Sequence, residues 1–206
     1  CATITNPDRE IILLGDDDNA WLADQYPIQH YYFADLNTGP LLKEFEENYR
    51  LIQGEKHVND KGGGKDWINF VFKRWFYIEK FTREQNIESF WHFDTDTMIL
   101  DDLSRHEKKF SSYDCTEQCR SNCMNGFINN RDVVRQYVKK INELFTREKL
   151  LEKQKREFEE ENPGFAFTEM RAYDIFKTEE DIESFHMANV VDNETFDDNL
   201  GAPRDY

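Results

Sequence analysis

Two aspartates one residue apart, Asp94 and Asp96, directly follow the apolar run 90–93, and this pair is the sequence feature best suited to chemistry. Side chains of a strand alternate between its faces, so both carboxylates would leave the strand end on the same side. Paired hard oxygen ligands suit Mg²⁺ or Mn²⁺, which completes its coordination with water and diphosphate oxygens. The pair therefore predicts a divalent-metal site. The alternative for an isolated D-x-D is a turn in a solvated loop.

Three cysteines, Cys115, Cys119 and Cys123, recur at every fourth residue. On a helix this spacing would place them on one face able to bind a soft metal, with His106 as the nearest candidate for a fourth ligand. Zinc sites, however, more often use C-x2-C pairs. We therefore expect reduced thiols in a cytosolic protein, with a structural metal or a disulfide within the cluster as the alternatives.

The net charge of −16 restricts the partners of the chain. An acidic surface repels nucleic-acid backbones and anionic lipids, whereas a divalent cation can still bring a phosphate-bearing small ligand to clustered carboxylates. No run approaches the roughly 20 apolar residues of a membrane span. We expect a cytoplasmic protein, of a cell or of an infected host cell, that binds no nucleic acid. Because the chain opens with Cys1, it could also be part of a larger multidomain chain.

Short apolar runs alternate with stretches of helical periodicity along the sequence. The predicted strands are 11–14, 30–34, 89–93, 126–128 and 190–191, and the predicted helices are 40–52, 66–84, 132–158 and one through 173–176. This alternation over 206 residues favours one α/β domain with a mostly parallel central sheet flanked by helices. Ligands of such sheets bind at the carboxyl ends of the strands, where Asp16 and Asp35 also stand.

An ordered series of motifs resembles glycosyltransferases of the GT-A fold, in particular the capsular-polysaccharide-type transferases. The motifs are Leu13-Leu14-Gly15-Asp16 for the first strand, Phe72-Lys73-Arg74-Trp75-Phe76 for an "RWF" helix, Phe93-Asp94-Thr95-Asp96 for the D-x-D, the run 124–130 for "N-x-G-hhhhN", and Thr168-Glu169-Met170 for a "D-Q" element. Together they cover nearly the whole chain. The resemblance implies a single GT-A-like (Rossmann-like) domain over 1–206. Its nucleotide-binding half would be about 1–96, and its donor-sugar and acceptor half about 97–206.

The resemblance also implies the metal ligands. Asp94 would lie near the ribose and the metal, and Asp96 would bind the Mn²⁺ or Mg²⁺ directly. Many members of the family supply a late histidine to the metal, for which this chain offers His186, with Asp198 as the alternative.

Contacts to the donor follow from the same resemblance. Gly15, Asp16 and Asp35 would surround the nucleotide base and ribose. Lys73 or Arg74 would meet a phosphate, although a surface pair on a helix is the simpler interpretation of two adjacent cations.

The remaining implied roles concern the sugar. Asn125 and Gly126 would border the donor sugar, and Glu169 would face the sugar or the acceptor. Glu169-Met170 stands where the family has Asp-Gln. In an inverting enzyme Glu169 would be the general base that removes the proton of the acceptor hydroxyl.

The function implied is the transfer of a sugar from a nucleotide-diphosphate sugar, UDP-linked by expectation, to a glycan or another hydroxyl acceptor. One alternative is an aspartate-nucleophile phosphatase, whose signature is also D-x-D. There a Thr or Val stands two positions after the second Asp, where this chain has Met98. The other alternative is a non-catalytic module of the same fold that binds a nucleotide or a glycan.

Overall fold

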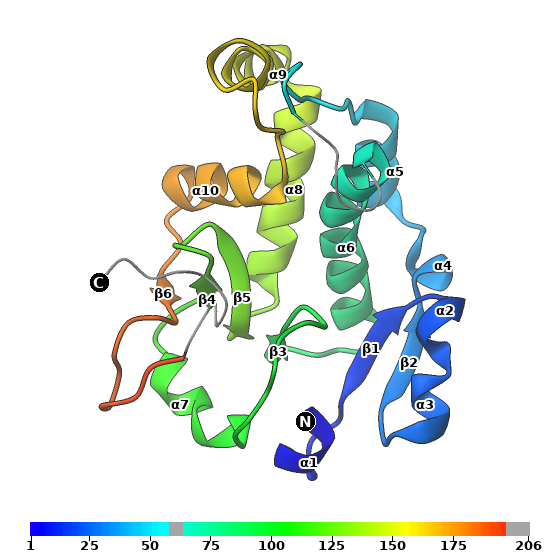
Figure 1. Ribbon diagram of the computed structural model, residues 1–206, viewed down its shortest axis with the longest axis vertical. Coiled ribbons are helices and arrows are strands. Elements are labelled where there is room, and N and C mark those ends of the chain that lie inside the picture. Colours follow the sequence, from blue (N-terminus) through cyan, green and yellow to red (C-terminus); the bar gives the residue numbers. More distant parts are fainter. Residues whose placement is uncertain (58–63, 197–206) are drawn as a thin grey trace.

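Helices pack around two small sheets in the computed structural model, which describes residues 1–57 and 64–196 (Figure 1). The strands are β1 (Ile12–Gly15), β2 (Gln29–Tyr32), β3 (Phe90–His92), β4 (Cys115–Gln118), β5 (Cys123–Ile128) and β6 (Ser184–His186). The helices are α1 (Ala2–Thr5), α2 (Asp17–Ala20), α3 (Leu22–Gln25), α4 (Phe33–Leu36), α5 (Pro40–Asn48), α6 (Gly64–Glu84), α7 (Glu107–Phe110), α8 (Asp132–Thr146), α9 (Glu148–Lys155) and α10 (Glu169–Glu179), with a 3₁₀ turn at Leu103–Arg105 and a π-helical turn at Arg156–Glu161. The predicted α/β class is confirmed.

The strands do not form the mostly parallel central sheet that the sequence predicts. β1 and β2 pair in parallel as a two-stranded sheet, and the other four strands form a mixed sheet in the order β3-β5-β4-β6. In the mixed sheet β5 runs antiparallel to both β3 and β4, while β4 and β6 are parallel. A tight turn between β4 and β5 makes these two neighbours a hairpin, and a hairpin is necessarily antiparallel. β3, β4 and β6 therefore all run in the same direction, opposite to β5. Their carboxyl ends lie at the same end of the sheet.

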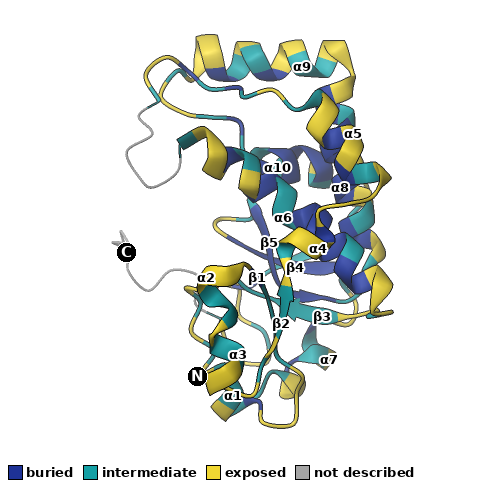
Figure 2. Ribbon diagram, turned by 90° about the vertical axis from the view of Figure 1, so that its right-hand side faces the viewer, coloured by how far each residue is buried: buried dark blue, intermediate teal, exposed yellow. Residues whose placement is uncertain are grey.

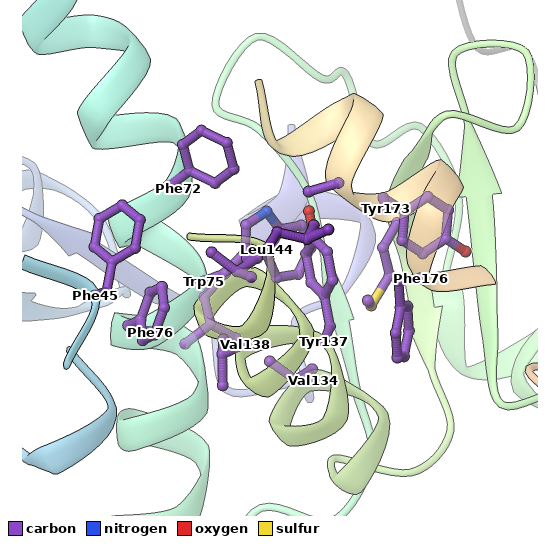
Figure 3. Close-up of a cluster of buried hydrophobic side chains, with 14 of the residues drawn as sticks. Phe45, Phe72, Trp75, Phe76, Val134, Tyr137, Val138, Leu144, Tyr173 and Phe176 are labelled. Carbon is purple, nitrogen blue, oxygen red and sulfur yellow. The ribbon is translucent and has the colours of Figure 1, made fainter. Parts of the chain in front are cut away.

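The core lies between α6, α8 and α10. On α6 the apolar residues Ile68, Phe72 and Trp75 recur at the spacing of one helix face, and each is almost completely buried. α8 stands between α6 and α10 and presents Tyr137 to both sides, so that its ring meets those of Trp75 and Tyr173 (Figure 3). Truncating one of these rings to Ala is expected to cost about 3–5 kcal/mol. The core therefore fixes α6 and α10, which carry residues of the candidate site.

Several predicted elements differ from the structure. The predicted helix 132–158 ends as α8 at Thr146, because Arg147 adopts an extended conformation before α9 begins. Much of α9 faces outward (Figure 2). The cysteine-rich stretch forms the β4–β5 hairpin and not a helix. The predicted last strand, 190–191, contributes only the isolated bridge between Val191 and Glu194, and β6 is the last strand among the residues that the structure describes.

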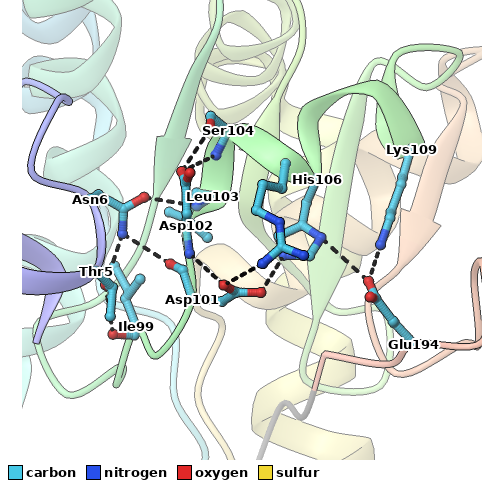
Figure 4. A network of polar contacts seen from close by, with 11 residues as sticks. Thr5, Asn6, Ile99, Asp101, Asp102, Leu103, Ser104, His106, Lys109 and Glu194 are labelled. Atoms are coloured by element: carbon cyan, nitrogen blue, oxygen red, sulfur yellow. Dashed lines mark hydrogen bonds and ion pairs between the residues drawn. The ribbon is translucent and has the colours of Figure 1, made fainter.

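The segment that follows Asp96 is anchored to the amino-terminal end of the chain. The buried Asn6 side chain donates to the carbonyl of Asp101 over 3.0 Å and accepts from the amide of Leu103 over 2.8 Å (Figure 4). Next to it, buried His106 lies between the carboxylates of Asp101 and Glu194. These contacts hold the part of the loop between β3 and α7 that leads into α7. Within the described ranges, no helix combines the length and apolar character needed to cross a bilayer.

Candidate functional site

Arg74 joins three parts of the chain that are far apart in sequence. Its Nη1 donates to Oδ1 of Asp94 over 2.7 Å, and its Nη2 donates to Oε1 of Glu169 over 3.0 Å. Arg74 lies on α6, Asp94 lies two residues after the end of β3, and Glu169 is the first residue of α10. We call these three residues the Arg74 cluster. They come from three of the motifs that carry the resemblance, and the structure brings them into direct contact.

Local structure explains how each carboxylate reaches Arg74. Asp94 opens a turn after β3, in which the amide of Thr97 donates to the Asp94 carbonyl over 2.9 Å. Glu169 stands at the amino terminus of α10, where the helix dipole favours a negative charge. The Tyr137 hydroxyl on α8 donates to the Glu169 carbonyl over 2.5 Å and so fixes the start of that helix.

The two carboxylates have different environments. The Asp94 side chain is 43% exposed, whereas that of Glu169 is 7% exposed. Burial raises the pKa of Glu169, and the guanidinium of Arg74 acts in the opposite direction. Among the described residues, neither Oε2 of Glu169 nor Nε of Arg74 has a hydrogen-bond partner, although both are buried. One oxygen of the Glu169 carboxylate is thus held by a cation, and the other is buried at the start of α10.

Two neighbours of the cluster were not predicted from the sequence. The ring of His92, on β3, packs edge-on against Trp75, and burial together with the charge of Arg74 lowers the pKa of His92 to about 4. His92 is therefore neutral at pH 7. Cys119 and burial raise the pKa of the Cys123 thiol, and the charges of Arg74 and Glu169 also act on it in opposite directions. Only the short distance in sequence from Cys123 to Asn125 could have indicated this position.

The predicted metal ligands are brought together only in part. Asp96 is exposed in the turn after Asp94, and in the described part of the chain its side chain makes no hydrogen bond or ion pair. His186 ends β6, and its Nδ1 accepts from the amide of Ala188 over 3.1 Å. β3 and β6 are opposite edges of the sheet, and at about 4.8 Å per strand His186 lies roughly 14 Å from β3. The sheet order thus does not bring His186 to the aspartates. The alternative ligand, Asp198, lies outside the described residues.

The remaining donor set is a pair of carboxylates on one turn, and Oδ1 of Asp94 is already bonded to Arg74. Residues 1–57 and 64–196 contain no group of three or more His, Cys, Asp or Glu side chains arranged to hold a metal ion. Mg²⁺ is commonly bound through one or two carboxylates, with water and substrate phosphates completing its coordination. Asp94 and Asp96 supply such a pair on an accessible turn.

The predicted nucleotide contacts lie at the end of β1 and in α4. The Asp16 carboxylate caps α2 by accepting from the amide of Asp18 over 3.2 Å and from the side chain of Asn19 over 2.9 Å. A Cβ on Gly15 would lie 1.9 Å from Oδ1 of Asn19, so a larger residue there would displace the Asn19 side chain from Asp16. Asp35 lies in the first turn of α4 and is exposed, rather than directly following a strand. Within the described residues, no hydrogen bond or ion pair links these three positions to the Arg74 cluster.

Asn125 and Gly126 are both buried in β5. The Asn125 side chain donates to Oε1 of Gln118 over 2.6 Å and accepts from the amide of Gly126 over 2.9 Å. Gly126 has a φ of 91°, and a Cβ there would lie 2.3 Å from Sδ of Met187 and 2.4 Å from Oγ1 of Thr116. Backbone conformation and packing together therefore require glycine at this position.

Comparison with protein-family models, with curated proteins and with solved structures finds no match to this chain.

Proposed function

We propose that this chain is a nucleotide-sugar-dependent glycosyltransferase of the GT-A type. The observation that carries the proposal is the double contact of Arg74 with Asp94 and Glu169. The resemblance assigns Arg74 to a phosphate, Asp94 to the ribose and metal, and Glu169 to the sugar or the acceptor, from three separate motifs. Their direct contact across more than 90 positions of sequence supports that common assignment.

The aspartate pair is the proposed metal site. Asp94 and Asp96 would hold Mn²⁺ or Mg²⁺, which supplies positive charge to stabilise the leaving diphosphate. Arg74 provides a second, permanent positive charge beside Asp94, and its planar fork suits carboxylates and phosphates alike. The cluster thus combines cationic and anionic groups next to an accessible turn.

Glu169 is the proposed general base. A base must be within hydrogen-bond reach of the hydroxyl proton that it removes, and its pKa should be raised toward the working pH. Oε2 of Glu169 is buried without a partner among the described residues, and burial raises the pKa of this carboxyl. Arg74 orients the carboxylate through Oε1, so that Oε2 can receive the proton of the acceptor.

The nucleotide would bind where β1 and β2 end. These strands are parallel, and ligands of parallel strands bind at their carboxyl ends. Gly15, Asp16 and Asp35 lie at or just beyond those ends. Asn125 and Gly126 are buried, so they would not contact the donor sugar directly. They would fix the conformation of β5 beside it.

The test is a screen for donor hydrolysis over nucleotide sugars with Mn²⁺, paired with calorimetry of UDP binding with and without Mn²⁺. We expect Mn²⁺-dependent UDP binding that is lost in Asp96→Ala and kept in Asp8→Ala, an exposed aspartate near the amino terminus. Equal UDP binding in the parent and in the Asp96 variant would refute the metal assignment. Release of phosphate from phosphomonoesters without nucleotide affinity would favour the phosphatase. Nucleotide or glycan binding without turnover of any donor would favour the binding module.

A further inference from the structure

The β4–β5 hairpin brings two cysteines together at its turn. Gln118, the last residue of β4, pairs with Cys123, the first residue of β5. Cys119 is the next residue along the chain after Gln118, and its side chain is near enough to the thiol of Cys123 to raise the pKa of that thiol. None of the four cysteines, all of which the structure describes, is in a disulfide.

The turn itself has an unusual and well-anchored backbone. Three consecutive non-glycine residues have left-handed φ values, 53° at Cys119, 58° at Arg120 and 69° at Ser121. Such conformations cost energy and persist only where the surroundings hold them. Lys177 on α10 donates to the carbonyl of Ser121 over 2.7 Å, and the amide of Asn122 donates back to Gln118 over 3.2 Å. These hydrogen bonds hold the turn, and the turn keeps the two cysteines close to each other.

The cysteines differ in accessibility. Cys119 is exposed, whereas Cys123 is 9% exposed. Cys115 is also buried, but its thiol contacts the Tyr173 hydroxyl at 3.5 Å. The third cysteine is thus engaged with α10, and the pair at the turn consists of one accessible and one sheltered thiol.

We propose that Cys119 and Cys123 form an oxidative modification site that closes into a disulfide when the protein meets hydrogen peroxide. The accessible thiolate of Cys119 attacks one peroxide oxygen, the O–O bond breaks, and a sulfenic acid and hydroxide result. The thiol of Cys123 then attacks the sulfenic sulfur, an S–S bond forms, and the oxygen leaves as water with the proton of Cys123. In total, two thiols lose two electrons and two protons, and one peroxide becomes two waters.

The site adjoins the Arg74 cluster but does not depend on the function proposed for it. The charges of Arg74 and Glu169 both act on Cys123, so oxidation removes a titratable neighbour of that cluster. Lys177, which holds the turn, belongs to the helix that begins with Glu169. The disulfide would therefore close in a turn that is bonded directly to α10.

The experiment uses the position of Arg120 between the two cysteines. The full chain is reduced, exposed to hydrogen peroxide, alkylated, unfolded and digested with trypsin, which cleaves after Arg120. Peptides 110–120 and 121–131 then separate in the reduced protein and remain joined only through a disulfide. We expect the joined pair as the main product of oxidation, and its disappearance after treatment with a thiol reductant.

Peptide 110–120 also contains Cys115, so the partner has to be assigned. The joined pair should persist in Cys115→Ser and disappear in Cys119→Ser, and fragmentation between these two positions gives the same assignment in the parent chain. A joined pair that survives in Cys119→Ser, or fragmentation that assigns the bond to Cys115, would overturn the proposal. Oxidation of Cys119 to sulfinic acid without any joined peptide would overturn it as well.

Discussion

Replacing Arg74 by Met tests whether the Arg74 cluster is a buried ion pair. Methionine keeps the length and helix propensity of the side chain and removes its charge. Glu169, with a 7% exposed side chain, would then be a buried carboxylate without a cation. Removing one partner of such a pair costs about 3–5 kcal/mol, because the other charge stays behind. Loss of the half-exposed contact with Asp94 adds only about 0–1 kcal/mol.

Lys73→Met is the matched control on the same helix. The Lys73–Glu46 pair has side-chain exposures of 17% and 43%, the same values as the Arg74–Asp94 pair, and a similar length of 2.6 Å. The two variants therefore lose an equivalent half-exposed ion pair, and only Arg74→Met also loses the contact with Glu169. We expect Lys73→Met to cost about 0–1 kcal/mol and Arg74→Met about 3 kcal/mol more, measured as the free energy of unfolding by urea at pH 7.

The pH dependence gives a second signature. Burial already raises the pKa of Glu169, and loss of Arg74 raises it further because the opposing charge is gone. A carboxyl with a raised folded-state pKa stabilises the fold fully below its unfolded pKa, about 4.3, and loses that contribution as the pH rises through the folded-state pKa. The difference in the free energy of unfolding between Arg74→Met and Lys73→Met should therefore become smaller from pH 7 to pH 5. A difference in the free energy of unfolding below about 1 kcal/mol at pH 7 would refute a buried contact between Arg74 and Glu169. A difference that stays the same between pH 7 and pH 5 would refute it as well.

Three further outcomes are expected. Glu169→Gln keeps the shape and removes the charge, so donor affinity should survive while transfer falls by about 10²–10⁴-fold, and unchanged transfer would exclude Glu169 as the base. Asp96→Ala should keep the stability of the parent in urea unfolding because Asp96 is exposed, while Mn²⁺-dependent UDP binding is lost in calorimetry. Gly126→Ala should cost roughly 2–4 kcal/mol through its φ of 91° and its clash with Met187, whereas Gly164→Ala, with no atom near its Cβ, should be close to neutral in the same unfolding assay.

Local patterns were sufficient for the elements that carry the candidate site. The strand that ends before Asp94 is an apolar run bounded by polar residues, and the helix that carries Arg74 has an apolar face at regular spacing. Gly15 also ends its strand as predicted. In each case the signal lies within a few consecutive residues, and burial of that segment agrees with its intrinsic preference.

Features that depend on distant contacts could not be predicted from the sequence. The turn at Cys119 has three left-handed residues and no glycine, and part of what holds it is a hydrogen bond from Lys177 on the distant helix α10. The position of His186 depends on strand order, which no local pattern specifies. The contact between Arg74 and Glu169 spans 95 positions. The resemblance suggested that these residues share a site. That they form a direct ion pair could be seen only from the fold.

Two buried polar atoms of the Arg74 cluster have no hydrogen-bond partner among the described residues, so the cluster is not optimal for stability alone. A buried ion pair is often no more stabilising than apolar residues of the same volume, and each buried polar atom without a partner costs about 1–3 kcal/mol. Nε of Arg74 and Oε2 of Glu169 are both such atoms within the described residues. The apolar core of α6, α8 and α10 lies directly beside them and could have been extended through these positions. A ligand that supplies an acceptor to Arg74 and a donor to Glu169 would satisfy both atoms, and a phosphate oxygen and a sugar hydroxyl have those properties.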